Sequence, residues 1–135
     1  MKHVSIFLIL FMISVNVALA ATVSIGDTIM SVEVMCSRED RSRGLQGRET
    51  LAENEGMLFV FEEPMKAHFW MKNTLIPLDI AFIDGKGKIV SIEAMEPETT
   101  DSHRSPIPVR YALETNQGWF ADREICVGAI VSVDV

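Results

Sequence analysis

Short apolar runs of strand length, separated by turn-forming residues, constrain the fold of this chain more than any other feature of its sequence. Residues 84–87 read Asp-Gly-Lys-Gly, a combination that favours a tight turn between two antiparallel strands. Before this turn, Leu78, Ile80 and Phe82 recur with the period of two that places side chains on one face of a strand. Another apolar run follows the turn as the return strand. The pattern predicts a β-hairpin over residues 78–95.

The same reasoning divides the rest of the chain into short strands and two short helical segments. A helix is predicted over residues 38–46, because Ser37 can cap its first turn and Asp40 follows three residues later. One helical turn or a loop is predicted over residues 119–124, and a loop over the proline-containing residues 96–108. Further strands are predicted over residues 29–36, 56–61, 66–72, 109–114 and 125–135.

This arrangement predicts a mainly β protein. Many short strands with one or two short helices are typical of an antiparallel sandwich or a partly open barrel. A repeated strand-helix-strand pattern is lacking in the sequence, so a parallel sheet is not predicted.

The first twenty residues have the pattern of a secretory signal peptide. Lys2 is followed by the apolar run 6–13 and then by Ala18-Leu19-Ala20, a small-x-small cleavage site. The alternative is a retained membrane anchor, but polar side chains interrupt the apolar run. We expect cleavage after Ala20, no stable membrane span afterwards, and one secreted, periplasmic domain over residues 21–135, a length that suits a single domain.

The charge of the chain is acidic, with 12 Lys and Arg against 19 Asp and Glu, a formal net charge of −7. Loss of the predicted signal peptide removes Lys2 and no acidic residue, so the remaining domain is more acidic still. Nucleic acid is therefore not expected as a partner, because the chain contains no basic stripe that could neutralise phosphates. The oligomeric state stays open.

Two cysteines lie far apart in the sequence, Cys36 and Cys126. Their spacing matches neither a C-x-x-C redox pair nor half of a zinc site. In an oxidising compartment they could form a disulfide, which would close a long loop and stabilise the fold by about 4–5 kcal/mol. The alternative is that both are separate, buried, small apolar residues. Both interpretations remain open.

Residues 68–74 form the segment with the highest density of side chains that could bind a ligand or take part in catalysis. In a strand, His68, Trp70 and Lys72 would share one side. Asp79 follows among apolar residues, where an unpaired carboxylate would be expensive to bury. If the chain turns between them, Lys72 and Asp79 become approximate cross-strand neighbours and could pair. The pair would either fix the strand register or form a charged patch beside Trp70.

Our leading functional hypothesis is a pocket that binds a small polar or carbohydrate-like ligand, with a ring of the ligand stacked on Trp70. Trp119 could form a second stacking platform, although it could equally be ordinary core together with Phe120. The candidate ligand-binding residues are Trp70, Lys72, Asn73, Asp79, Arg110 and Trp119, with Arg110 as an anion contact.

Two other classes of function are retained as alternatives. One is a hydrolase that uses Asp79 with a second acid, Glu93 or Glu114, or with His68 as base. The other is an accessory domain that binds another cell-envelope protein. A cysteine nucleophile at Cys36 has weaker support, because its position at a strand end fits packing better.

A metal site is not predicted, and neither is a cofactor. Met65, His68 and Met71 offer soft ligands that would suit copper. In a strand, however, Met65 and Met71 fall on the face opposite His68, so the three side chains cannot converge.

Several sequence blocks resemble the family called domain of unknown function 192 (DUF192). The blocks read Gly-Met-Leu-Phe-Val-Phe at residues 56–61 and Phe-Trp-Met-Lys-Asn-Thr-Leu-Ile-Pro-Leu-Asp at residues 69–79, followed by Arg-Tyr-Ala-Leu-Glu at residues 110–114. The resemblance implies a compact, mostly antiparallel β domain with a short helix after the first strand. It implies no reaction and assigns no catalytic residue. Cys36 and Cys126 are not part of the family pattern, so a disulfide would be a local feature of this chain.

Overall fold

The structure is a computed structural model, and it describes residues 19–134. Most of the predicted signal peptide, residues 1–18, lies outside the described residues. Within residues 19–134, the helices are too short to cross a membrane.

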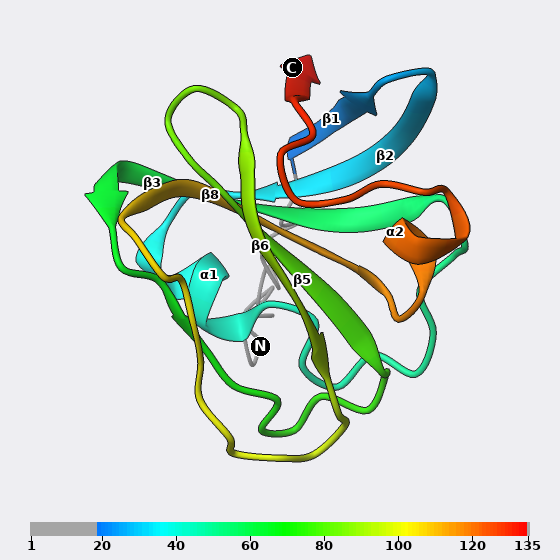
Figure 1. Ribbon diagram of the computed structural model, residues 1–135. Coiled ribbons are helices and arrows are strands. Elements are labelled where there is room, and N and C mark those ends of the chain that lie inside the picture. The colour runs from blue at the N-terminus through cyan, green and yellow to red at the C-terminus, as the bar shows by residue number, and fades with distance from the viewer. Residues whose placement is uncertain (1–18, 135) are drawn as a thin grey trace, which may run out of the picture.

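Seven of the nine strands in the described part of the chain form one sheet with the strand order β6-β5-β8-β3-β2-β1-β9 (Figure 1). Its strands are β1 (Leu19–Ile25), β2 (Thr28–Met35), β3 (Glu55–Met65), β5 (Leu78–Ile83), β6 (Ile89–Met95), β8 (Val109–Asn116) and β9 (Val131–Asp134). A second, two-stranded sheet consists of β4 (His68–Phe69) and β7 (His103–Arg104), and the helices are α1 (Arg38–Arg43) and α2 (Trp119–Asp122).

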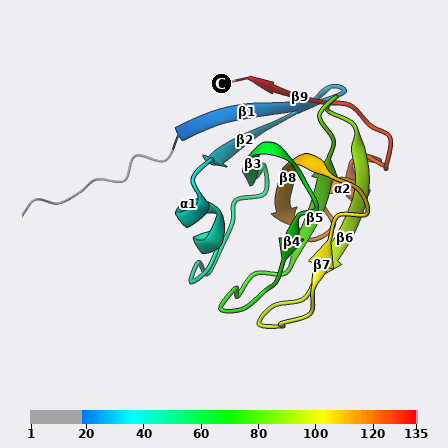
Figure 2. The same cartoon turned by 90° about the vertical axis from the view of Figure 1, so that its left-hand side faces the viewer.

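The large sheet curls so far that its two edges meet at one end. Lys88, just before β6, forms an isolated bridge with Ile130, just before β9. Beside this bridge, the Val131 N–H donates to the carbonyl oxygen of Gly87 at 2.7 Å. Figure 2 shows β1, β2 and β9 across the top of the molecule, with β5 and β6 descending from them. The predicted mainly β class is confirmed, in the form of a partly open barrel.

One pair of strands departs from the antiparallel prediction. β2 and β3 run parallel, with Val32 opposite Gly56 and Val34 opposite Leu58. The reason is that α1 and the loop after it carry the chain back across the molecule before β3 begins, which is the connection that parallel strands require. The helix that the sequence predicts is therefore a crossover between two central strands.

The local predictions at turns and caps are confirmed. The hydroxyl of Ser37 accepts a hydrogen bond from the Asp40 N–H at 3.0 Å, and α1 ends at Gly44, whose φ of 47° suits glycine. In the predicted hairpin, the carboxylate of Asp84 accepts hydrogen bonds from the backbone N–H groups of Lys86 and Lys88. Short-range polar groups thus fix both features where the sequence places them.

Several strands differ from the prediction, and the short strand β7 lies inside the segment predicted as a loop over residues 96–108. β1 was not predicted at all, and it pairs with β2 through the two-residue turn at residues 26–27. β3 continues through Pro64, because its register with β8 shifts between Val60 and Met65 and a ladder N–H is not needed there. The predicted strand over residues 66–72 shrinks to β4, and that over residues 125–135 shrinks to β9.

Two apolar clusters cover the two faces of the large sheet. The interior cluster takes residues from all seven strands, including Leu58 and Leu113, together with Trp119 and Phe120 of α2. The outer cluster includes Phe59, Phe61, Ile80 and Phe82, with Met71 and Ile76 from the segment after β4. Because neighbouring residues of a strand point to opposite faces, β3 and β5 are buried on both sides. Any cleft on the outer face therefore has a rigid floor.

The possible disulfide is not present, since Cys36 and Cys126 are both free and exposed. The alternative of two buried apolar residues is also wrong. Cys36 follows β2 at the start of the crossover, and Cys126 lies in the loop before β9. The sequence spacing carried no information on how far apart these two segments would lie.

Candidate functional site

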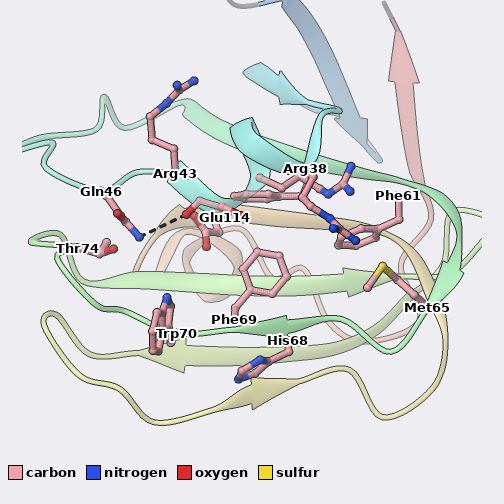
Figure 3. A pocket seen from close by; sticks show the side chains of 14 residues that line it. Arg38, Arg43, Gln46, Phe61, Met65, His68, Phe69, Trp70, Thr74 and Glu114 are labelled. Carbon is pink, nitrogen blue, oxygen red and sulfur yellow. Dashed lines mark hydrogen bonds between the residues drawn. The ribbon is translucent and has the colours of Figure 1, made fainter.

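A cleft of about 500 Å³ opens on the outer face of the sheet (Figure 3). It lies between α1 with its following loop on one side and the β4 segment on the other, over the strands β3 and β8. The lining residues are Arg38, Arg41, Ser42, Arg43, Gly44, Gln46, Phe59, Phe61, Met65, His68, Phe69, Trp70, Thr74 and Glu114.

The α1 wall is rich in arginine. Arg38, Arg41 and Ser42 have the spacing that places side chains on one face of a helix. Arg41 fastens this wall to the sheet, because its guanidinium donates to the carbonyl oxygens of Cys36 and of Val60, the latter at 3.1 Å. The same guanidinium lies 5.5 Å from the ring centroid of Phe61. The position of α1 over the cleft is thus set by a charged side chain and an aromatic ring.

The opposite wall is aromatic. The ring of Phe69 packs edge-on against Phe59 at 4.9 Å between centroids, and it also contacts Phe82 at 5.9 Å. Trp70 follows Phe69 and leaves 47% of its surface exposed. The ammonium group of Lys72 lies 5.4 Å from the Trp70 ring. A rigid aromatic stack therefore holds a partly exposed indole at the edge of the cleft.

The floor carries one buried carboxyl group, that of Glu114 on β8. In the sheet Glu114 stands between Met57 of β3 and Ile80 of β5, and only 5% of it is exposed. Burial raises the pKa of Glu114 to about 8 from an ordinary value of 4.5. Figure 3 shows Glu114 in the middle of the lining residues. At neutral pH this side chain is mainly the protonated acid, which can donate as well as accept a hydrogen bond.

Among the candidate ligand-binding residues, only Trp70 lines this cleft. Lys72 is exposed beside it, and Asn73 has a φ of 55° and accepts a hydrogen bond from the Gly47 N–H at 2.9 Å. That bond connects the segment after β4 to the loop after α1. Both residues therefore lie next to the cleft, and the carbonyl group of Asn73 helps to hold its two walls together at one end.

Asp79 faces the other side of the sheet. On β5 it alternates with Ile80, so its side chain points to the interior face, where it accepts a hydrogen bond from the Gly118 N–H at 2.9 Å. Burial raises the pKa of Asp79, and the hydrogen bond from Gly118 partly offsets this shift. The predicted Lys72–Asp79 pair is wrong, because β5 pairs Asp79 with Ala94 and Thr115 instead.

Trp119 and Arg110 also lie away from the cleft lining. Trp119 is 3% exposed and packs edge-on against Phe120 at 5.1 Å, so the core interpretation of Trp119 is confirmed. Arg110 is half-buried on β8, and its Nε atom has no hydrogen-bond partner among the described residues.

The geometry does not assemble the hydrolase proposed from Asp79 and His68, because His68 lines the cleft on the outer face whereas Asp79 points inward. Glu93 and Glu114 flank Ile80 on its two neighbouring strands, and Glu93 lies 3.9 Å from His103.

Met65 and His68 both line the cleft, while Met71 is buried in the core. Within residues 19–134, no cluster of three His, Cys, Asp or Glu side chains could hold a metal ion.

Sequence reasoning missed the arginine wall. A six-residue helix that is polar throughout predicts a solvated surface, so the sequence alone does not indicate Arg38 and Arg41 as site residues. Their spacing is the signal that places them on one face. The sequence allows Glu114 to be a second acid for Asp79 or part of a solvated strand face, and the second interpretation is wrong because only 5% of Glu114 is exposed. Its burial depends on strands that are distant in sequence.

Comparison with known proteins shows that this chain is similar to a family of uncharacterised proteins. Residues 21–133 match the model of the DUF192 family, which is described as an uncharacterised ACR. A crystal structure described as a candidate transcription regulator from Sinorhizobium meliloti 1021 is 31% identical, covers 86% of this chain and 95% of that chain, and has a TM-score of 0.83. A protein of unknown function from Novosphingobium aromaticivorans DSM 12444 is 30% identical, covers 85% of this chain and 84% of that chain, and has a TM-score of 0.78. No match was found among curated proteins.

Proposed function

The chain belongs to the DUF192 family of uncharacterised proteins, and we propose that it is a binding protein whose cleft between α1 and β4 takes a small polar molecule containing a ring. The observation that carries this proposal is the cleft itself. Its volume of about 500 Å³ falls within the range typical of small-molecule sites, roughly 300–1,000 Å³. Its lining combines apolar and aromatic surface with a few polar groups, which is the composition such sites have.

The aromatic wall supports a ring-containing ligand. Phe59 is buried and Phe69 is partly buried against it, so little conformational entropy is lost when a ligand contacts this stack. The half-exposed indole of Trp70 offers a flat face at the edge of the cleft, on which a sugar or another planar ring can stack. Thr74, Gln46 and Glu114 supply the polar contacts that would orient the bound molecule.

The other functional classes have less support. A hydrolase built on Asp79 would need His68, Glu93 or Glu114 beside it, and these three residues lie on the opposite face of the sheet. Transcription regulation, the description given to the relative from Sinorhizobium meliloti 1021, would require contacts to nucleic acid, and the net charge of −7 opposes this. An accessory role toward another cell-envelope protein would use exposed apolar side chains such as Leu75 and Ile107, but these do not line the cleft.

A screen with a matched pair of variants tests the proposed function. Sugars, peptides and nucleotides of the cell envelope are added to the purified protein, and thermal unfolding and tryptophan fluorescence are recorded. For any compound that binds, we expect Trp70→Ala to weaken binding by about 5- to 150-fold, since stacking on one aromatic ring contributes on the order of 1–3 kcal/mol. Thermal unfolding without ligand should change little, because Trp70 is half-exposed.

Leu75→Ala is the control, because Leu75 is 44% exposed and lies outside the lining. Its affinity for the same compound should equal that of the unmodified protein. If no compound raises the unfolding temperature, small-molecule binding is the wrong function. If Trp70→Ala binds as tightly as Leu75→Ala, the ligand does not occupy this cleft.

We also propose that the protein is exported and acts in the periplasm after cleavage following Ala20. The charged start, apolar run and small-x-small site support this proposal, as does the start of the family match at residue 21. Cleavage there would remove Leu19 and Ala20 from β1 and leave residues 21–25 paired with β2. Mass spectrometry of the protein from a periplasmic fraction should find Ala21 as the first residue. Recovery of chains that begin at Met1 from the membrane fraction would contradict export with cleavage.

A further inference from the structure

The charge of the cleft is opposite to the charge of the protein. The chain has a formal net charge of −7, yet three of its arginines, Arg38, Arg41 and Arg43, line the cleft. The only acidic residue in the lining is Glu114, and His68 is the only other titratable side chain there. A cleft lined by one sign of charge concentrates ligands of the opposite sign. An acidic protein with a basic cleft therefore selects for an anion at this place.

The three arginines differ in how many hydrogen-bond and ion-pair partners they have within the protein. Arg41 donates to two backbone carbonyl oxygens and so serves to hold α1 on the sheet. Arg43 forms an ion pair with Asp40 at 2.9 Å, within α1. For Arg38, in contrast, the described part of the chain supplies neither a hydrogen-bond partner nor an ion-pair partner. Its guanidinium is the donor that remains available to a ligand in the cleft.

The buried acid does not cancel this charge. Because the pKa of Glu114 is raised to about 8, its side chain is mainly neutral at pH 7 and adds no negative charge to the floor. The charged and titratable side chains that line the cleft with it are Arg38, Arg41 and Arg43 from α1 and its end, and His68 from β4. On the sheet, Glu33 of β2 and Glu93 of β6 lie one strand further away in the same row, beyond Met57 and Ile80. A bound anion would thus meet positive or neutral side chains throughout the cleft while the pH stays below 8.

Resting on the proposed function, we infer that the ligand of this cleft is an anion attached to a planar ring, with its carboxylate or phosphate group paired to Arg38 and its ring against Phe69 and Trp70. Arginine presents parallel N–H donors that match the oxygens of a carboxylate or phosphate. The aromatic wall lies opposite α1 across the cleft, so one molecule can contact both. The neutral carboxyl of Glu114 hydrogen-bonds to the polar part of the ring.

The test compares ligands that differ only in charge. Indole-3-acetate and indole-3-acetamide have the same ring and nearly the same shape, and phenyl phosphate is the arm that separates phosphate from carboxylate recognition. Titrations are followed by NMR of the full-length protein at pH 6.5 and low salt. We expect the two anions to bind at least about tenfold more tightly than the acetamide, since a charge-assisted hydrogen bond is roughly twice as strong as a neutral one.

Arg38→Ala should reduce the affinity for the anions to that for the acetamide and leave the acetamide unaffected. Arg104→Ala is the matched control, because Arg104 is exposed on β7, outside the cleft, and its loss changes the net charge equally. If Arg104→Ala weakens anion binding as much as Arg38→Ala, the effect comes from overall charge and the inference is wrong. Resonances of Phe69 and Trp70 should shift when either anion binds.

A pH series gives an independent readout. Raising the pH from 6.5 to 9 ionises Glu114 and places a negative charge on the floor, so binding of the anions should weaken several-fold while the acetamide changes less. In Glu114→Gln this difference should disappear. Equal affinities for indole-3-acetate and indole-3-acetamide would overturn the anion inference and leave the binding function intact. If none of the three probes binds, the stated ligand class is wrong. The wider screen then decides whether the cleft binds anything.

Discussion

Glu114→Gln is expected to stabilise the folded protein at pH 8 by roughly 2–4 kcal/mol and to have little effect at pH 4.5. The reason is the buried carboxyl group, whose pKa rises from 4.5 in the unfolded chain to about 8 in the folded one. Each pH unit between these two values costs the folded state about 1.4 kcal/mol, because the unfolded chain releases its proton and the folded chain keeps it.

The sign of this effect fixes the pH window. The contribution of Glu114 to stability is fully present below pH 4.5, falls as the pH rises to 8, and then levels off, since both states are ionised above that value. Glutamine has nearly the same shape and no ionisable proton, so it removes this slope. Urea unfolding at several pH values between 4.5 and 9 measures the difference between the two proteins.

Glu63→Gln provides the control, because this substitution also replaces an acid with an amide and Glu63 is exposed on β3. Its unfolding free energy should follow that of the unmodified protein at every pH. Parallel curves for Glu114→Gln and the unmodified protein would mean that the floor of the cleft is wetter than the structure indicates. In that case the neutral acid could not be part of ligand recognition.

Gly87→Ala is expected to destabilise the fold by about 2–5 kcal/mol. Gly87 has a φ of 84°, which an L-residue with a side chain adopts only with strain. A Cβ atom at this position would also lie 2.7 Å from the carbonyl oxygen of Val131, so backbone would have to move. The neighbouring Val131 N–H donates to the Gly87 carbonyl, and this contact closes the sheet into a partial barrel.

Gly26→Ala separates the two causes. Gly26 lies in the β1–β2 turn with a φ of 57°, but an added Cβ atom there has no neighbour within 4 Å. Its effect should therefore be limited to backbone strain, about 1–2 kcal/mol. Denaturant unfolding of both variants gives the comparison. Equal losses would show that the overlap of the added Cβ atom with Val131 costs nothing beyond backbone strain.

The features that the sequence predicted correctly are those set by neighbouring residues. The Ser37 cap, the turn at Asp84 and the alternation along β5 each depend on groups within a few positions of one another. The mainly β fold class was predicted from the same local patterns. Resemblance to the DUF192 blocks pointed to the same mostly antiparallel domain, and only the parallel β2–β3 pair departs from it.

The candidate site depended on contacts between distant residues, and here the predictions were less complete. Trp70 was identified because an aromatic residue beside lysine and asparagine is conspicuous in a sequence. Asp79 was conspicuous too, but the face of the sheet it occupies depends on where β5 begins. Lys72 lies outside any strand, because β4 ends at Phe69 and β5 pairs with β6 and β8 instead. A shift of one residue in a strand moves a side chain to the opposite face.

Arg38 and Glu114 line the same cleft although they are far apart in the sequence, Arg38 before β3 and Glu114 on β8. They come together because β3 pairs with β2 on one edge and with β8 on the other. A polar six-residue helix gives no apolar stripe from which its orientation could be deduced. The acidic composition of the whole chain further concealed a basic site, since net charge averages over all surfaces.

The pairing of β3 also sets the order in which this molecule can assemble. Each of its ladders joins segments that are distant along the chain, Val32 with Gly56 and Leu58 with Leu113. The hairpins β1–β2 and β5–β6 close short loops and can form early, whereas β3 must wait for partners from both halves. Such non-local topologies fold in milliseconds to seconds. Because β9 pairs with β1, that edge of the sheet stays unpaired until residues 131–134 have joined it.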